Sequence, residues 1–487
     1  MEKKQEEAIS DAKEVDLKNY SLNKQDELTE DQKLMVKRYL RKVDIRILPI
    51  VILLYVFSLI DRGNIGAALV SGMNEYLHLN TVQQGNSTTF FYIFYLIFET
   101  PANVLLKKTK PHYWFGFLGS AWSISCMALA FAKTPTIFII LRGCLGAFES
   151  GLTPGVVGYL HYWYTRSEVA SRMTMFFIAV PVSGVIGSPI TAALASKDLG
   201  PFKPFQAIFF VEGLITLVIA IVLFFVLIDY PDQAKFFTPE ERELILKRLN
   251  TEQGMASTTK PSFKQTLKIM SDWKLYVNAL IFFGLNTVAT VTGIFNPTLL
   301  KISGYSGTTA IYMGTVGSIL GVIGVLITLR LVNRVPFYML LCSYAAISVV
   351  FYAVAAFSNG KILRFIFLSI AGFGSSPNIA IPLTWASINT GGVYKGLISS
   401  AIVISIGSIP GVIFPRLFTS NYAPKFLKGQ LSIIISGASA IVLALIMAAY
   451  YRAENKRRDE NPVDLSHMPI EEQRLLNDLH PDFRYKL

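Results

Sequence analysis

Charged side chains interrupt stretches of this sequence that are otherwise apolar. They are Asp61, Arg62, Glu99, Arg142, Glu149 and Glu212. Burial in a medium of low dielectric disfavours the charged form of a carboxylate, which can then exchange a proton near neutral pH. An arginine keeps its charge in such a place and can bind an anion through two parallel hydrogen bonds. This combination of residue types indicates proton exchange beside an anion-binding site.

Spacing relates four of these charges to one another. Arg142 and Glu149 are seven residues apart, which on a helix is about two turns or roughly 10 Å, so they share nearly one face and suggest a common hydrated cavity. Asp61 and Arg62 are adjacent and point in different directions. We expect Asp61 and Glu149 to exchange protons and Arg62 and Arg142 to bind substrate, because isolated charges inside a membrane mark transport paths.

The other two carboxylates, Glu99 and Glu212, are interpreted as structural charges that hold helices together by pairing. The second half of the chain has essentially no charges in its apolar stretches. It offers amides and hydroxyls instead, at Asn286, Asn296, Ser375, Ser376, Asn378 and Asn389. Of these, Asn286, Asn378 and Asn389 are predicted to contact the substrate.

Composition indicates the elements that must position these residues. The chain has 487 residues, of which 52% are hydrophobic and 16% charged, whereas soluble domains carry about 25% charged residues. Crossing a bilayer takes about 20 apolar residues. Stretches of this kind lie at 45–68, 88–106, 113–132, 136–160, 172–195, 206–229, 274–299, 310–331, 335–357, 363–387, 397–418 and 430–451. The sequence therefore predicts an all-α membrane protein with twelve transmembrane helices.

A hydrophilic stretch separates these spans into two sets of six. The predicted organisation is a cytoplasmic N-terminal tail (1–44), an N-terminal six-helix bundle (45–229), a cytoplasmic central loop (230–273), a C-terminal six-helix bundle (274–451) and a cytoplasmic C-terminal tail (452–487). Lys and Arg are several times more frequent on the side assigned to both termini than on the opposite side, which places both termini in the cytoplasm. The polar first 44 residues are not a cleavable signal peptide.

Two short helices are expected outside the spans. Residues 1–28 are interpreted as disordered, and the capping-box pattern at 29–32 then predicts a short basic helix through Lys42 at the membrane surface. In the central loop, Thr238-Pro239-Glu240-Glu241 predicts a helix through about Leu249. Its Leu244, Ile245 and Leu249 are expected to pack on the cytoplasmic ends of the bundle.

Several classes of function are excluded by the same sequence. The net charge of +12 is explained by cytoplasmic Lys and Arg, and no basic face for nucleic acid can be separated from a lipid-facing one. Cys126, Cys144 and Cys342 lie in apolar stretches at spacings that match no metal or redox motif. There is no P-loop, zinc signature or nucleophile elbow. No metal, cofactor or enzymatic activity is predicted.

Motifs in a fixed order resemble those of a known family. They are Asp61-Arg62-Gly63-Asn64-Ile65-Gly66, the stretches 99–108 and 142–151 with Pro154-Gly155, Phe210-Val211-Glu212-Gly213, Asp229-Tyr230-Pro231, the stretch 238–242, Trp385, Asn389, Ala423-Pro424 and Gly429. Over about residues 40–455 the chain resembles the fungal allantoate-permease branch of the anion:cation symporter family, within the major facilitator superfamily. It departs from that branch at Gly63, where Ser or Thr is common, and at Ala67, where Asn is frequent.

The resemblance implies two six-helix halves, alternating access and proton-driven uptake of small organic anions. Substrates in this branch include allantoate, ureidosuccinate, nicotinate, pantothenate and biotin. The resemblance also implies that Glu149 and Asp61 are the proton sites, that Arg62 contacts the substrate carboxylate or gates with Asp61, and that Arg142 pairs with a carboxylate or polarises Glu149. The charge pattern points to the same four residues independently.

The favoured hypothesis is a monomeric, proton-coupled importer of a small carboxylate, embedded in the lipid bilayer of the plasma membrane. A vacuolar or endoplasmic reticulum membrane is the alternative location. The second hypothesis is an exporter or uniporter of an internal membrane. The third is a nutrient sensor that transports nothing.

Overall fold

The computed structural model describes residues 30–106, 108–196, 200–253, 267, 269–332, 334–358, 360–390, 393–419, 422, 426–461, 468 and 476–487. Within these residues the regular structure is helical and contains no strand. Lipid offers no partners for backbone N–H and C=O groups, so an apolar stretch satisfies them internally by forming a helix. The prediction of an all-α membrane protein is confirmed.

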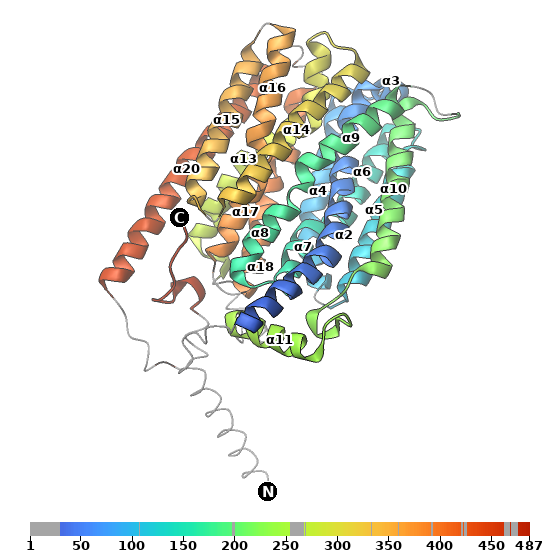
Figure 1. Ribbon diagram of the computed structural model, residues 1–487. Helices are drawn as coiled ribbons and strands as arrows, with labels where there is room; N and C mark the ends of the chain where they lie inside the picture. The colour runs from blue at the N-terminus through green and yellow to red at the C-terminus, as the bar shows by residue number, and fades with distance from the viewer. Residues whose placement is uncertain are drawn as a thin grey trace.

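Helices occupy all twelve predicted spans and run side by side (Figure 1). The first half contains α2 (Glu30–Val70), α4 (Thr81–Leu106), α5 (Pro111–Leu129), α6 and α7 (Pro135–Glu149 and Leu152–Leu160), α8 and α9 (Arg166–Phe176 and Ala179–Ala195) and α10 (Pro204–Val226). The second contains α13 (Trp273–Ile302), α14 (Gly307–Leu331), α15 (Phe337–Phe357), α16 and α17 (Lys361–Ser375 and Pro377–Ile388), α18, α19 and η3 (Val393–Ser408, Pro410–Ile413 and Phe414–Phe418) and α20 (Leu427–Glu460). Judged by length and apolar composition alone, ten spans among the described residues could cross a membrane. Helices α4 and α5, which occupy the other two predicted spans, are not among these ten.

Four spans are broken into consecutive helices, which the sequence analysis did not predict. Proline begins two of the later helices, Pro377 in α17 and Pro410 in α19, because it lacks the N–H that would continue the preceding helix. In the fourth span, α6 ends at Glu149 and α7 begins at Leu152. Helix α6 therefore ends on Glu149, one of the charged residues that interrupt the apolar stretches of the sequence.

Helix α2 corrects one expectation. The predicted short basic helix at the membrane surface is instead the first part of a single helix of 41 residues that continues through the span. Its Val36, Tyr39 and Val43 are buried, and the Tyr39 hydroxyl donates to the backbone oxygen of Trp163. Protein contacts along its inner face keep this segment in line with the span. Thr29 and residues 1–28 lie outside the described residues.

Helix α11 (Pro239–Gln253) crosses the lower side of the molecule, meaning the side on which α11 lies in Figure 1. The predicted capping box is confirmed: Glu241 N donates to Thr238 Oγ1 over 3.2 Å, and Thr238 N donates to a Glu241 carboxylate oxygen over 3.1 Å. Ile245 and Leu249 are buried, as predicted. Lys42 Nζ lies 2.8 Å from both Glu241 carboxylate oxygens, so α11 is tied directly to α2.

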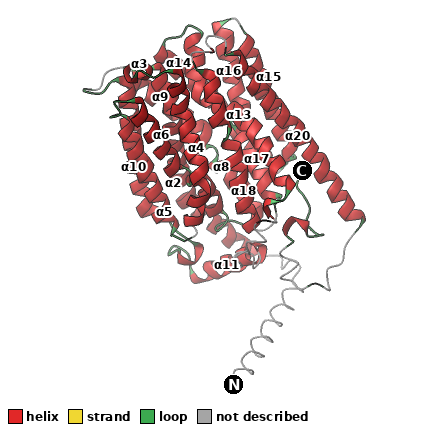
Figure 2. Ribbon diagram, turned by 180° about the vertical axis from the view of Figure 1, so that it is seen from behind, coloured by secondary structure: helices red, strands yellow, loops and turns green. Residues whose placement is uncertain are grey.

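Each half packs mainly on itself, and several helix pairs join the two halves, including α4 with α18, α19 and η3. Helix α5 packs on α10 and α4 on α6 in the first half, while α15 packs on α16 and α13 on α20 in the second (Figure 2). Between the halves, α2 lies against α13 and α9 against α14. A Cβ on Gly66 would overlap with the backbone oxygen of Ile294, and one on Gly184 with the Ser318 hydroxyl. The glycines permit this close approach. The exact division of the chain at about 229 and 274 stays a prediction.

The segment 476–487 docks on the lower side of the second half. Its Asp478 is 1% exposed and accepts from the ammonium groups of Lys274 and Lys395, the second over 2.5 Å. Tyr485 stacks on Tyr451 with ring centroids 4.5 Å apart. Burial favours the neutral form of the Asp478 carboxyl, but the two ammonium groups outweigh this effect and hold its pKa below the usual range. The docked segment thereby connects the lower ends of α13, α18 and α20.

Candidate functional site

A central cavity of about 290 Å³ lies between the two halves. Helices α2, α4, α7 and α9 line it from the first half, and α13, α14, α16, α17 and α18 from the second. Arg62 is the one charged side chain among its described lining residues. The lining of the cavity therefore combines apolar residues and uncharged polar residues with a single cation.

Arg62 is paired with Glu149 in this structure. Its Nη2 and Nε atoms lie 2.5 and 3.1 Å from Glu149 Oε1, and Ser58 Oγ donates to the same oxygen over 2.6 Å. Ser58 and Arg62 are four residues apart on α2, so both reach the end of α6 from one helix face. All three donors converge on Oε1. Glu149 Oε2 is buried without a hydrogen-bond partner among the described residues.

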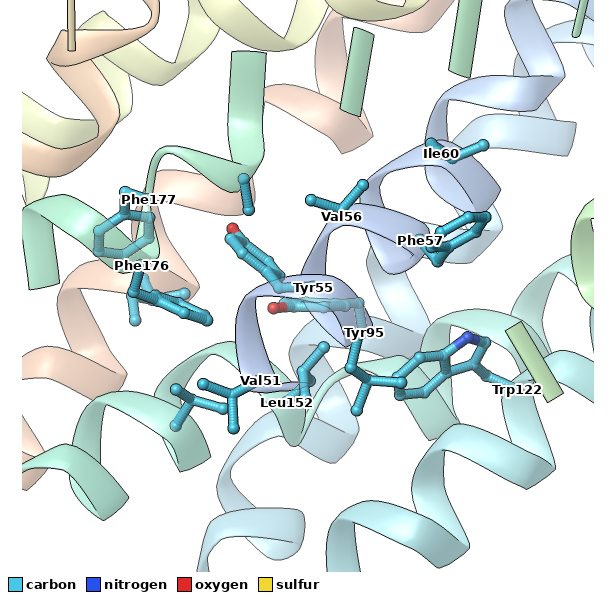
Figure 3. Close-up of a cluster of buried hydrophobic side chains, with 14 of the residues drawn as sticks. Val51, Tyr55, Val56, Phe57, Ile60, Tyr95, Trp122, Leu152, Phe176 and Phe177 are labelled. Atoms are coloured by element: carbon cyan, nitrogen blue, oxygen red, sulfur yellow. The ribbon is translucent and has the colours of Figure 1, made fainter. Parts of the chain in front are cut away.

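Aromatic rings surround this ion pair. The Arg62 guanidinium lies 5.0 Å from the Tyr95 ring centroid and 5.5 Å from that of Phe91. Figure 3 shows Tyr55 and Tyr95 near each other, with Phe176 and Phe177 on one side and Trp122 on the other. Tyr55 stacks on Phe176 at 4.6 Å. The Phe91 and Tyr95 rings cover part of the Arg62 guanidinium, and the reduced contact with water strengthens its interaction with an anion.

Asp61 points away from the cavity, into the first bundle. Its Oδ2 accepts from Thr216 Oγ1 over 2.9 Å and from Trp122 Nε1 over 3.3 Å. Thr216 Oγ1 also lies 3.0 Å from the backbone oxygen of Glu212. A hydroxyl has one hydrogen and a backbone carbonyl can only accept, so both contacts of Thr216 are satisfied together when Asp61 carries a proton. The environment of Asp61 therefore accommodates its protonated form.

Arg142 lies apart from the cavity. Its Nε donates to the backbone oxygen of Ser87 over 3.2 Å, and neither Nη atom has a hydrogen-bond partner among the described residues. The Phe91 ring is 5.2 Å from this guanidinium and 5.5 Å from that of Arg62. Neither Arg142 nor Glu149 is among the described residues that line the central cavity, so this cavity is not the shared hydrated one predicted for them.

The two carboxylates interpreted as structural each join two helices. Glu99 on α4 accepts from Ser405 on α18, across the boundary between the halves. Glu212 on α10 accepts from Thr191 on α9 over 2.5 Å, within the first half. In each case the second carboxylate oxygen is buried without a partner among the described residues. The structural role assigned to them stays a prediction.

The three predicted asparagines lie in different places. Asn286 lines the cavity, and its Nδ2 donates to the backbone oxygen of Gly407 over 2.7 Å. Asn378 is buried outside the cavity lining. Asn389 bonds the backbone of Lys486 twice, donating over 2.9 Å and accepting over 2.8 Å. Its amide therefore anchors the C-terminal segment, and we do not retain Asn389 as a substrate ligand.

Sequence reasoning missed several members of the site. Ser58 could have been found from its spacing of four residues before Arg62. Tyr92 and Tyr95, three apart on α4, both line the cavity. Trp122 and Thr216 have no local signal, because only the packing of α2, α5 and α10 brings them to Asp61.

Comparison with known proteins agrees with this arrangement. An uncharacterized transporter of Schizosaccharomyces pombe is 29% identical over 93% of this chain and 90% of its own length. The high-affinity nicotinic acid transporter of Saccharomyces cerevisiae is 28% identical over 93% of this chain and 85% of its own. A protein of Agrobacterium vitis that carries the name of a tartrate transporter is 34% identical, over 59% of this chain and 63% of its own.

Solved structures share the fold at low sequence identity. The proton:xylose symporter XylE superposes with a TM-score of 0.64 at 12% identity, over 83% of this chain and 95% of that one. The Escherichia coli fucose:proton symporter FucP superposes with a TM-score of 0.57 at 16% identity, over 82% of this chain and 98% of that one. The family model of the Major Facilitator Superfamily matches residues 51–415. With twelve spans in two halves around a central polar cavity, the chain belongs to the Major Facilitator Superfamily.

Proposed function

We propose that this transporter imports a small organic anion together with protons, by alternating access to the central cavity. The observation that carries the proposal is that Arg62, on the cavity wall, is paired with Glu149 behind it. A substrate carboxylate and the Glu149 carboxylate compete for one guanidinium. Protonation of Glu149 removes its charge and leaves Arg62 available to the substrate, so anion and proton are bound together.

We propose that Glu149 takes the proton on Oε2, because of how its two oxygens are bonded. Oε1 is surrounded by donors from Ser58 and Arg62, whereas Oε2 has no partner among the described residues. A proton added to Oε2 displaces no existing hydrogen bond. Asp61 is proposed as a second proton site because its contact with Thr216 suits the protonated acid.

Contacts between the halves on both sides of the cavity are candidates for the gates. On the upper side, Thr89 Oγ1 donates to the backbone oxygen of Val412 over 3.0 Å, and Lys301 Nζ donates to that of Val70 over 3.2 Å. On the lower side, Glu99 accepts from Ser405. Alternating access requires the contacts of one side to open while the other side stays closed.

The substrate class is supported by the site and by the relatives. A lone arginine in an uncharged cavity suits a carboxylate, and the relatives include proteins named for nicotinic acid and for tartrate. We place the chain in the allantoate-permease branch of anion:cation symporters on its ordered motifs. The proposed location is the plasma membrane, with both termini in the cytoplasm and a monomer as the working form.

Uptake by cells expressing the protein tests this function. Labelled nicotinate, pantothenate, biotin and allantoate would be supplied at external pH 5 and 7.5, with surface expression confirmed. We expect one compound to accumulate, more at pH 5, and accumulation to stop when an uncoupler removes the proton gradient. Accumulation insensitive to both pH and uncoupler would refute proton coupling. No uptake of any compound by protein at the cell surface would refute the substrate class.

A further inference from the structure

The charges on the cavity wall limit the charge of the substrate. Arg62 is the one cation among the described lining residues, and Glu149 lies directly behind it. With Glu149 protonated, this pair contributes one net positive charge; with Glu149 ionised, it contributes none. Arg142 lies outside the cavity lining, with its guanidinium 5.2 Å from the Phe91 ring centroid, so it offers no direct hydrogen bond to a substrate in the cavity. The site can therefore neutralise one carboxylate and no more.

The described lining residues of the second half include no charged side chain, and they combine apolar residues with neutral hydrogen-bonding ones. Its lining polar residues are Asn286, Thr290, Thr292, Asn296, Ser318, Ser375, Ser376 and Ser408. Helices α2 and α13 cross closely at Gly66 and Ile294, so one turn earlier on each helix Arg62 and Thr290 lie at similar depth. Asn296 lines the cavity with its Oδ1 buried and without a partner among the described residues. An uncharged polar group of a ligand would satisfy this atom.

A second carboxylate in this cavity would be desolvated without a cation. Burying an ion without a compensating charge costs several kcal/mol, whereas hydroxyls and amides suit an uncharged polar group. The cavity volume of about 290 Å³ is also at the small end of ligand sites, which span roughly 300–1,000 Å³.

We propose that the cavity selects small monocarboxylates whose remaining part is uncharged and hydrogen-bonding, and that it rejects dicarboxylates. This inference rests on the proposed function and narrows its substrate class. It separates the two named relatives by chemistry: nicotinate carries one carboxylate and tartrate carries two. This chain is assigned to the first type.

The test compares each dicarboxylate with its own monoamide, which has nearly the same shape and one charge fewer. Binding of tartrate and tartramate, and of pyridine-3,5-dicarboxylate and its monoamide, would be measured on the purified full chain at pH 7.5 by calorimetry. We expect each monoamide to bind at least about tenfold more tightly than its diacid. Equal or tighter binding of the diacids would overturn the inference and leave the proposed function intact. If the diacids, their monoamides and nicotinate all fail to bind, both the inference and the proposed function are overturned.

A variant with a second cation provides the complementary test. Asn296→Lys replaces an amide on the cavity wall by an ammonium group, and Asn296→Gln is the neutral control. We expect the lysine variant to reduce or reverse the preference for the monoamide and the glutamine variant to retain it. Thr290→Lys, with Thr290→Val as control, repeats the test from another turn of α13 if the first variant does not fold. Lysine variants that both fold and both retain the wild-type preference would overturn the inference.

Discussion

Replacing Glu149 by a neutral residue should make the affinity for substrate independent of pH. In the structure, Glu149 Oε1 accepts two hydrogen bonds from Arg62. Hydrogen bonds to a charged group contribute about 1.5–3 kcal/mol each and neutral ones about 0.5–1.5 kcal/mol. Glu149→Gln therefore removes roughly 2–3 kcal/mol of competition for the guanidinium, which corresponds to roughly 30–150-fold in affinity. At alkaline pH, the variant should bind a monocarboxylate tighter than the wild type by this factor.

The assay is calorimetric binding of the tightest monocarboxylate to the purified protein, from about pH 5 to pH 8. Wild-type affinity should fall as pH rises, because ionised Glu149 recaptures Arg62, and the variant's affinity should stay level. In cells, Glu149→Gln should abolish proton-driven accumulation and leave exchange of internal for external substrate partly intact. Ser58→Ala removes one donor to Oε1 without changing charge, and we expect a smaller effect of the same sign.

Glu241→Gln is the matched control. It also removes a carboxylate that is bonded to a cation, Lys42, but on α11 and away from the cavity. We expect the wild-type pH dependence in this variant. The competition mechanism is refuted if Glu149→Gln keeps that pH dependence, or if its affinity at pH 8 is no higher than that of the wild type.

Three further substitutions test other parts of the structure. Arg62→Lys should weaken monocarboxylate binding by at least about tenfold, because an ammonium cannot make two parallel bonds; an unchanged Kd would remove Arg62 from the site. Gly66→Ala should slow uptake strongly without preventing folding, since the added methyl overlaps with the Ile294 oxygen; uptake at the wild-type rate would show that α2 and α13 need not close here. Asp478→Asn should reduce stability by about 3 kcal/mol, seen as a lower Tm, because it leaves two buried ammonium groups underneutralised. Because the pKa of Asp478 is depressed in the folded state, its ion pairs stabilise the fold above pH ~4, and this stabilisation is lost as the pH falls below that value. The difference in Tm between the wild type and Asp478→Asn should therefore narrow only under acid. A difference that stays constant down to pH 3 would contradict the stabilising role of the Asp478 ion pairs.

The spans could be predicted because lipid imposes one rule on every apolar stretch. Apolar stretches separated by short polar or turn segments located all twelve, and the cap at Thr238 located α11. The extent of α2 could not be predicted in this way. Whether its basic first turns lie on the membrane or continue the span depends on tertiary contacts, such as those of Tyr39 and Lys42 with distant segments.

The site was predicted in its residue types but not in its pairings. Membrane burial singled out Arg62 and Glu149, which lie together. It also singled out Arg142, but the position of the Phe91 ring is decided by the packing of α4 on α6 and has no local signal. The contact of Asn389 with Lys486 could not be predicted either, because an amide at the end of a span can bond a chain segment as well as a ligand, and Lys486 is 97 residues away.

Helix α2 connects the wall of the central cavity to α11 through one continuous helix. Lys42, which holds α11, and Arg62, which faces the cavity, belong to one helix and are 20 residues apart, or about 30 Å along its axis. A rotation or tilt of α2 that accompanies substrate capture and is transmitted past Pro49 displaces its lower end and the α11 helix attached to it. A fluorophore attached at the exposed Glu240 of α11 would then report events in the cavity from outside the membrane, in solution and in real time.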